Sequence, residues 1–83
     1  MITKITELVG MEGKKLMFTN MNTARKKTRE VTVKEVRVTA GGTIVTAYLE
    51  MYLPVTGNTE EIVISNEPNE MMGQLYFENV RLE

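Results

Sequence analysis

The chain has 83 residues, of which 42% are hydrophobic and 25% charged, and its formal net charge is −1. This size predicts one small domain, residues 1–83, with a modest core. The chain has no apolar run near the roughly 18 residues of a membrane span, no secretory signal pattern and no cysteine. We therefore expect a cytoplasmic protein without a membrane partner.

The first segment predicts a short N-terminal helix. Apolar residues recur there at helical spacing, at Ile2, Ile5, Leu8 and Val9. Thr3 is suited to cap this helix and Gly10 to end it, after about two turns. A strand is the alternative, because Ile5, Glu7 and Val9 also alternate between apolar and polar.

Residues 14–20 predict the first strand, with Leu16 and Phe18 on its core face. Residues 21–28 have the polar composition of a loop. A basic run lies at the end of this loop and continues into the next strand.

A long hairpin over residues 29–53 follows, and the other strands are arranged around it. The pair Gly41-Gly42 is suited to the positive φ angles of a two-residue hairpin loop. The resulting pairs are Ala40 with Thr43, Val38 with Val45, and Val36 with Ala47.

The alternation of the first hairpin strand slips by one residue, whereas that of its partner strand does not. Its apolar positions are Val31 and Val33, then Val36 and Val38. One extra residue at Lys34-Glu35, opposite Tyr48, restores the register and predicts a β-bulge. The predicted pairs beyond the bulge are Val33 with Leu49 and Val31 with Met51.

The rest of the chain predicts two more strands. The alternation of the last one shifts phase near Glu78-Asn79, which predicts a bulge or a bend there. The predicted elements are a turn over 54–58, a strand over 59–65 with Ile62 and Ile64 inward, a turn or short 3-10 segment over 66–70, and a strand over 74–82.

This order of elements predicts a mainly β fold with a short N-terminal helix and five antiparallel strands. It resembles the element order of small SH3-like or Sm-like barrels, and that resemblance implies a five-stranded antiparallel barrel. The resemblance covers residues 3–82 but no signature residues. Neither an Sm base-binding motif nor an SH3 aromatic run is present, so it implies no family membership.

The composition restricts the chemistry that this fold can carry. The chain has no histidine, no cysteine and no aspartate. Zinc, copper and iron sites need imidazole or thiolate ligands, so we expect neither a metal nor a cofactor. A Ser-His or Cys-His nucleophile is excluded, and acid–base catalysis would depend on Glu, Lys or Tyr alone. We therefore expect a protein that is not an enzyme.

The basic run is the sharpest local feature. It contains Arg25, Lys26, Lys27 and Arg29. Such cations bind phosphate groups as point charges or forks, which makes this loop a candidate site for RNA or single-stranded nucleic acid. Solvation of the loop without a ligand is the alternative.

The outer face of the hairpin is the second candidate surface. The predicted register places Arg37, Tyr48 and Tyr52 on it, and the bulge directs Lys34 the same way. Aromatic rings beside cations on an exposed sheet can stack bases. Apolar residues also point outward here, so we expect partial cover by the N-terminal helix, a second copy of the chain or a partner protein.

The charges are divided unequally along the chain. Residues 1–41 hold nine Lys and Arg against four Glu, a net of +5, and residues 42–83 hold one Arg against seven Glu, a net of −6. This division indicates one face that attracts anions, unless the hairpin brings the two halves together and cancels it.

The near-neutral charge and the semi-apolar outer face favour a non-enzymatic protein-interaction module. It would act as an adaptor, assembly component or small inhibitor through the outer face of the 29–53 hairpin, and its size is common among phage and mobile-element accessory proteins. Binding of RNA or single-stranded nucleic acid through the 25–29 loop and Tyr48 is the alternative. Open strand edges also predict a homo-oligomer.

Overall fold

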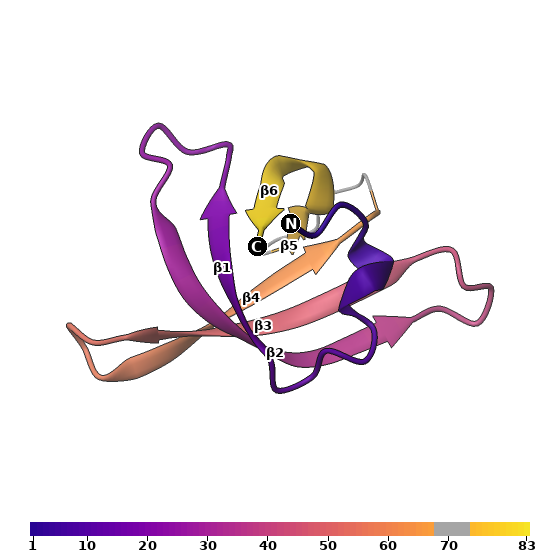
Figure 1. Ribbon diagram of the computed structural model, residues 1–83, viewed down its shortest axis with the longest axis horizontal. Helices are drawn as coiled ribbons and strands as arrows, with labels where there is room; N and C mark the ends of the chain where they lie inside the picture. Colours follow the sequence, from indigo (N-terminus) through magenta and orange to yellow (C-terminus); the bar gives the residue numbers. More distant parts are fainter. Residues whose placement is uncertain (68–73) are drawn as a thin grey trace.

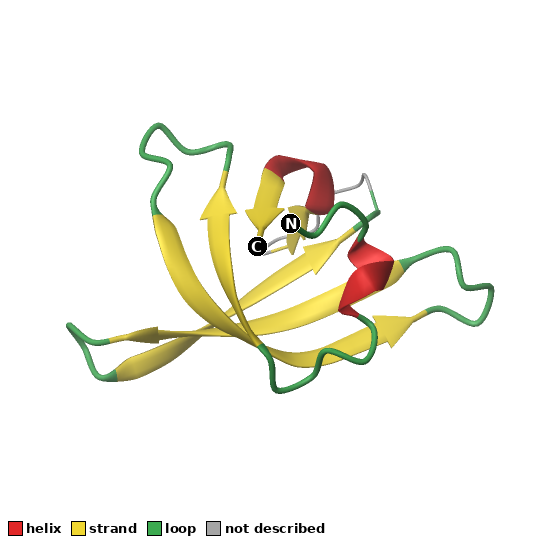
Figure 2. Ribbon diagram, viewed as in Figure 1, coloured by secondary structure: helices red, strands yellow, loops and turns green. Residues whose placement is uncertain are grey.

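The computed structural model of the chain, shown in Figures 1 and 2, describes residues 1–67 and 74–83. Its elements are the 3-10 turns η1 (Ile5–Leu8) and η2 (Phe77–Asn79) and the strands β1 (Lys15–Asn20), β2 (Thr28–Val38), β3 (Val45–Leu53), β4 (Asn58–Ser65), β5 (Gln74–Tyr76) and β6 (Val80–Leu82). The strands form one sheet in the order β5-β4-β3-β2-β1-β6. Neighbouring strands are antiparallel except β4 and β5, which are parallel.

The sheet is curled into a half-barrel. Strands β5 and β6 lie at its opposite edges, although only the three residues of η2 connect them. The two edges must therefore approach each other, and Figure 1 shows the resulting curvature. The N-terminal segment follows the β6 edge, where Ile2 N donates to Leu82 O at 2.8 Å.

The concave face of the sheet encloses the core. Along β3, every second residue from Val45 to Met51 is buried and the residues between them are half-buried. Ile5 and Leu8 of η1 belong to the same buried cluster and close one end of the concave face. The buried apolar residues are Ile5, Leu8, Leu16, Phe18, Val31, Val33, Val45, Ala47, Leu49, Met51, Ile64, Phe77 and Leu82.

The structure confirms the predicted bulge in the long hairpin. Val33 pairs with Leu49 and Glu35 pairs with Tyr48, so Lys34 is the extra residue on β2. The predicted pairs of Val38 with Val45 and of Val36 with Ala47 also form. The predicted pairing of Val31 with Met51 is wrong, because the β2–β3 register ends at Thr32↔Glu50.

The predicted two-residue loop of this hairpin is wrong. Thr39 N donates to Ile44 O at 2.9 Å, so the loop has four residues. Of the two glycines only Gly42 has a positive φ, of 72°. Within the loop Gly42 N donates to Thr39 O, and the Thr39 hydroxyl accepts from Ile44 N at 3.2 Å. A four-residue loop of this kind needs a single positive φ and keeps the predicted register.

The predicted two-turn helix at the N-terminus is wrong, and the alternative strand is not formed either. The residues instead form the single 3-10 turn η1. Residues three apart lie above one another in a 3-10 turn, so one turn suffices to bury Ile5 and Leu8. Glu7 Oε2 accepts hydrogen bonds from the backbone N–H groups of Thr3 (2.8 Å) and Lys4 (2.7 Å), so Glu7, not Thr3, secures the start of the turn.

The predicted single last strand is also wrong. The bend expected near Glu78-Asn79 is the turn η2, which divides the segment into β5, parallel to β4, and β6, paired with β1. The chain has to cross from one sheet edge to the other here, which a continuous strand cannot do. The sheet therefore has six strands, not five antiparallel ones. The turn predicted over 66–70 falls largely outside the described residues.

The strands predicted over residues 14–20 and 59–65 are confirmed to within one residue at each end, as β1 and β4. In the described part of the chain no helix has the length and hydropathy to span a membrane.

Candidate functional site

The sheet divides in the middle of β2. On one side β2 pairs with β1 from Lys15↔Thr32 to Thr19↔Thr28. On its other side it pairs with β3 only as far as Thr32↔Glu50. Beyond that point the β1–β2 hairpin and the β3–β4 hairpin diverge, as Figure 1 shows. We call the space between the two hairpins the split.

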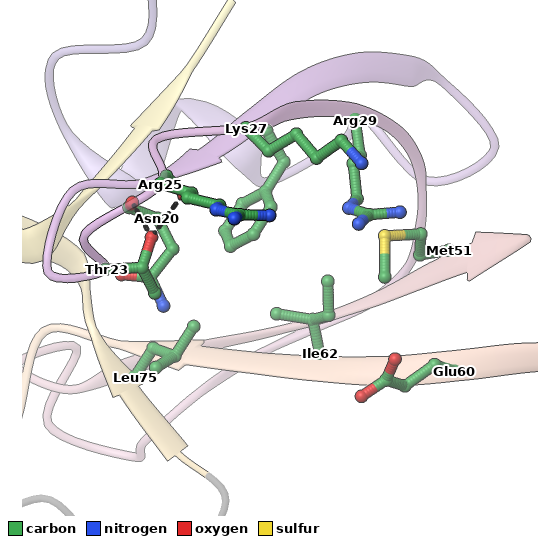
Figure 3. A pocket seen from close by; sticks show the side chains of 10 residues that line it. Asn20, Thr23, Arg25, Lys27, Arg29, Met51, Glu60, Ile62 and Leu75 are labelled. Atoms are coloured by element: carbon green, nitrogen blue, oxygen red, sulfur yellow. Dashed lines mark hydrogen bonds between the residues drawn. The ribbon is translucent and has the colours of Figure 1, made fainter. Parts of the chain in front are cut away.

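A pocket of about 440 Å³ lies in the split on the concave side. Its apolar lining is formed by Phe18, Met51, Ile62 and Leu75. Arg25, Lys27 and Arg29 line the wall contributed by the β1–β2 hairpin, and Glu60 lies on the wall contributed by β4. In Figure 3 the three cationic side chains extend over the opening, opposite the apolar side chains of β4 and β5. The pocket thus presents positive charge beside an apolar surface.

Strand alternation decides which cations reach the pocket. The buried valines of β2 face the concave side, and Arg29 continues their two-residue spacing. Lys27 and Arg25 continue the same spacing and also line the pocket. Lys26 lies between them and instead lines a separate groove beside Arg81. The basic run that the sequence presents as one site is therefore divided between two surfaces.

The loop that carries these cations is ordered by its own polar groups. The Thr23 hydroxyl lies 3.1 Å from the backbone oxygen of Asn20 and 2.8 Å from that of Arg25, and it donates its one proton to these two acceptors. Lys27 N donates to Arg25 O at 2.9 Å, and Asn22 N donates to the Asn20 side chain at 3.0 Å. These bonds fix the backbone of Arg25 and Lys27, so the two side chains start from defined positions at the rim of the pocket.

The cations of the pocket form no ion pair with the residues that the structure describes. Among the described residues, no carboxylate oxygen lies within 4.0 Å of the charged groups of Arg25, Lys27 or Arg29. Their charge is therefore available to an anionic ligand. Glu60 is the acidic side chain that lines the pocket with them.

The convex face of the sheet carries the other predicted site residues, Lys34, Arg37, Tyr48 and Tyr52. Its cations are paired: Lys34 Nζ lies 3.7 Å from Glu50, and Arg37 Nε lies 2.9 Å from Glu35. The Arg37 guanidinium also lies 4.9 Å from the centre of the Tyr48 ring, within the range of a cation–π contact. The hydrogen bond and the charge of Glu35, together with Tyr48, raise the pKa of Arg37.

The two predicted surfaces lie on opposite faces of the sheet. Tyr48 lies between the buried Ala47 and Leu49 in β3, so its side chain points to the convex side, away from the pocket. Tyr52 shares that side and is 61% exposed. The structure thus does not bring the tyrosines to the basic loop. The N-terminal turn packs in the concave core, so it is not the cover expected for the convex face.

Ion pairs seldom join the basic and the acidic half of the chain in the described structure. Of the four ion pairs in the described part of the chain, Lys34–Glu50 alone joins the basic first half to the acidic second half. The other pairs are Lys15–Glu30, Arg37–Glu35 and Arg81–Glu83. The split consequently has a basic wall from the first half and an acidic residue, Glu60, on the wall from the second half.

The sequence did not identify the apolar lining of the pocket. Ile62 was predicted to point inward and Met51 to pair with Val31, but the divergence of β2 from β3 leaves both side chains at the edge of a pocket. Their pattern alone gives no signal for this, because a closed sheet would bury the same side chains.

Comparison of the chain with family models, with curated proteins and with solved structures finds no match. Within residues 1–67 and 74–83, no three acidic side chains are grouped closely enough to hold a metal ion. The chemistry of the candidate site therefore has to be judged from its own side chains, which offer charge and apolar surface.

Proposed function

We propose that the chain is a non-enzymatic protein-interaction module that binds an acidic segment of a partner protein in the pocket of the split. The observation that supports this most directly is the set of three cations, Arg25, Lys27 and Arg29, which have no carboxylate within ion-pair distance in the described structure and which border an apolar surface. An adaptor, an assembly component or a small inhibitor would use such a site, and the cysteine-free composition favours a cytoplasmic setting.

The ligand should combine carboxylates with one apolar side chain. Burial of a leucine-sized side chain contributes about 1.5–3 kcal/mol, and the lining of Met51, Ile62 and Leu75 offers such a surface. Carboxylates beside the anchor would meet the cations at the rim. The convex face is a weaker candidate for this role than the sequence indicated, because its cations already pair with Glu35 and Glu50.

Single-stranded nucleic acid is the second candidate ligand, because the three cations follow one another at two-residue spacing along one wall. Sequence-tolerant binding of this kind usually combines cations with exposed aromatic rings that stack on bases. The aromatic residue of the pocket, Phe18, is only 6% exposed, and Tyr48 and Tyr52 lie on the other face. This arrangement favours the acidic peptide over the nucleic acid.

A fluorescence anisotropy titration tests the proposal. The probes are a labelled peptide, Ser-Glu-Ser-Leu-Ser-Glu-Ser, and a labelled oligouridine of similar length. Replacement of Arg25, Lys27 and Arg29 by Ala should weaken peptide binding about fivefold, since the two Glu side chains of the peptide form two partly exposed ion pairs that contribute roughly 0.5 kcal/mol each.

The matched control replaces three cations that pair on the convex side, Lys15, Lys34 and Arg37, and therefore removes the same amount of charge. This control should bind the peptide like the unmodified chain. Equal weakening by both triple variants would mean that binding depends only on the net charge of the chain, and it would contradict the proposal. Tight binding of oligouridine without peptide binding would favour the nucleic acid instead.

A further inference from the structure

The backbone of β2 directs hydrogen-bonding groups into the split. Val33 N donates to Lys14 O (2.9 Å) and Val33 O accepts from Gly13 N (2.7 Å), so both polar groups of Val33 face the β1 side. In a strand these groups alternate from side to side, so those of Thr32, Glu30 and Thr28 face the β3 side. Thr32 is the last of them that has a partner in β3. The N–H and C=O groups of Glu30 and Thr28 therefore open into the split without a strand partner in the described structure.

The opposite wall of the split has a similar edge. Leu53 O accepts from Gly57 N at 2.8 Å, so the polar groups of Leu53 face β4. By the same alternation those of Tyr52 face the split. β3 is paired with β4 through Met51, Tyr52 and Leu53, but its register with β2 has ended at Glu50. In the split the sheet thus has two facing edges, and none of the described strands lies between them.

We infer that the acidic segment binds in the split as an extended strand that hydrogen-bonds to the free edge of β2 at Glu30 and Thr28. This inference rests on the proposed function and specifies how the same pocket recognises its ligand. Addition of a peptide strand to an exposed sheet edge gives affinity through main-chain bonds, and the pockets beside the edge select the side chains.

The length and pattern of the segment follow from strand geometry. Residues 28–31, beyond the last β2–β3 pair at Thr32, span about 10 Å at roughly 3.3 Å per residue, so three or four residues of the partner pair along this edge. Every second side chain of the partner faces the pocket, beside Arg29 and the apolar lining. The side chains between them face the convex side. The ligand should therefore carry its carboxylates and its apolar anchor at alternate positions, as Ser-Glu-Ser-Leu-Ser-Glu-Ser does.

N-methylation of the peptide tests this binding mode, because a methyl group removes a backbone donor and leaves the side chain. Two peptides are compared with the unmodified one, the first N-methylated at its inner Ser residues and the second at its Glu and Leu residues. In an antiparallel pair the Ser N–H groups face β2, so the first peptide should bind at least about tenfold more weakly and the second within about twofold of the unmodified peptide. The reverse result supports parallel addition of the strand.

Equal effects of the two methylation patterns, or no effect of either, would overturn the inference. The proposed function would stand in that case if binding still depended on Arg25, Lys27 and Arg29. Absence of binding by the unmodified peptide would overturn both.

A variant of the chain provides a second test. Glu30→Pro removes the N–H that faces the split and leaves the bonds of β2 to β1, since the polar groups of Glu30 face away from β1. It should weaken peptide binding about fivefold or more, as expected for one lost main-chain bond. The matched variant Glu30→Ala loses the same side chain and its contact with Lys15, and it should bind normally. Equal binding by the two variants, with circular dichroism showing that both are folded, would contradict strand addition at β2.

Discussion

The convex face of the long hairpin and the concave split both carry lysine and arginine side chains. In the described structure those on the convex face form ion pairs, whereas those in the split do not. On the convex face Arg37 is held by Glu35 at 2.9 Å and lies over the Tyr48 ring at 4.9 Å. In the split Arg25 and Arg29 have no such partners in the described structure and border an apolar pocket. The number of cations on a surface therefore says little about binding until their intramolecular partners are known.

Strand alternation explains why two arginines of the same strand differ in this way. Arg29 and Arg37 both lie in β2, eight positions apart, and an uninterrupted strand would direct them to the same face. The bulge at Lys34 changes the phase between them. As a result Arg29 faces the pocket with the concave residues, whereas Arg37 faces outward beside Tyr48.

Removal of the bulge should have the largest effect. Deletion of Lys34 puts the two halves of β2 in one phase, so either Val31 and Val33 or Val36 and Val38 turn outward. Exposure of the buried Val31 and Val33 costs about 3–6 kcal/mol of unfolding free energy, which is a large part of the stability of a small domain. The second outcome costs less, because Val36 is only half-buried and Val38 is already 47% exposed. Urea unfolding followed by circular dichroism measures this loss.

The control for the deletion is Lys34→Ala, which keeps the extra residue and removes only the exposed contact with Glu50. Its unfolding free energy should stay close to that of the unmodified chain. If the deletion and the substitution unfolded at the same urea concentration, the bulge would not set the phase of β2.

A pair of matched substitutions in β2 should separate binding from stability. Arg29→Gln should weaken binding of the acidic peptide severalfold and leave the melting temperature unchanged, because Arg29 has no ion pair in the described structure to lose. Arg37→Gln should lower the melting temperature slightly through loss of the Glu35 and Tyr48 contacts, and leave peptide binding unchanged. Anisotropy and thermal unfolding measure the two properties. If both variants changed peptide affinity and melting temperature in the same way, the two faces would not differ in their role in binding.

A substitution at the other end of the concave face, which η1 closes, should change the stability only slightly. The residue concerned is Glu7. Backbone hydrogen bonds from Lys4 and Thr3, and one from the Thr3 hydroxyl, lower the pKa of Glu7 below its ordinary value. A carboxylate with a lowered pKa in the folded state stabilises the fold above its pKa in the unfolded state, and this contribution is lost as the pH falls through the folded-state pKa.

Glu7→Gln should therefore be slightly less stable than the unmodified chain at neutral pH, and the difference should disappear in acid below the folded-state pKa of Glu7. Thermal unfolding of both proteins over that range measures it. A difference that grew as the pH fell would contradict the assigned role of Glu7. Peptide binding in the split should not change in this variant, since η1 lies outside the pocket.

The sequence predicted the bulge but not the split, and the reason is the range of the interactions involved. The slip in β2 against the regular alternation of β3 is a local pattern that two strands suffice to explain. The same pattern predicts that Val31 continues to pair with Met51, which it does not. That pairing ends in a sheet that curls enough for η2 to join β5 and β6, an arrangement that depends on the whole chain. The alternation of apolar and polar residues within two strands does not show where their pairing ends.

The residues of the candidate site were also predicted only in part, because local sequence patterns do not define their three-dimensional arrangement. Arg25, Lys27 and Arg29 were identified from their charge, but their separation from Lys26 and from Tyr48 depends on which face each side chain occupies. The apolar lining was identified as core, since Met51 and Ile62 have the pattern of buried strand residues. The position of these side chains beside an opening follows from the divergence of two hairpins, which only the three-dimensional arrangement defines.

Binding of the acidic segment in the split is measured by a titration of the isotopically labelled chain with the peptide Ser-Glu-Ser-Leu-Ser-Glu-Ser, followed in amide NMR spectra. The backbone amides of Arg25, Lys27, Arg29 and Glu30, together with those of Met51 and Ile62 on the other wall, should shift with a common affinity, and those of Arg37 and Tyr48 should stay in place. Shifts confined to the convex residues would contradict the assignment of binding to the split and would return the site to the outer face of the hairpin.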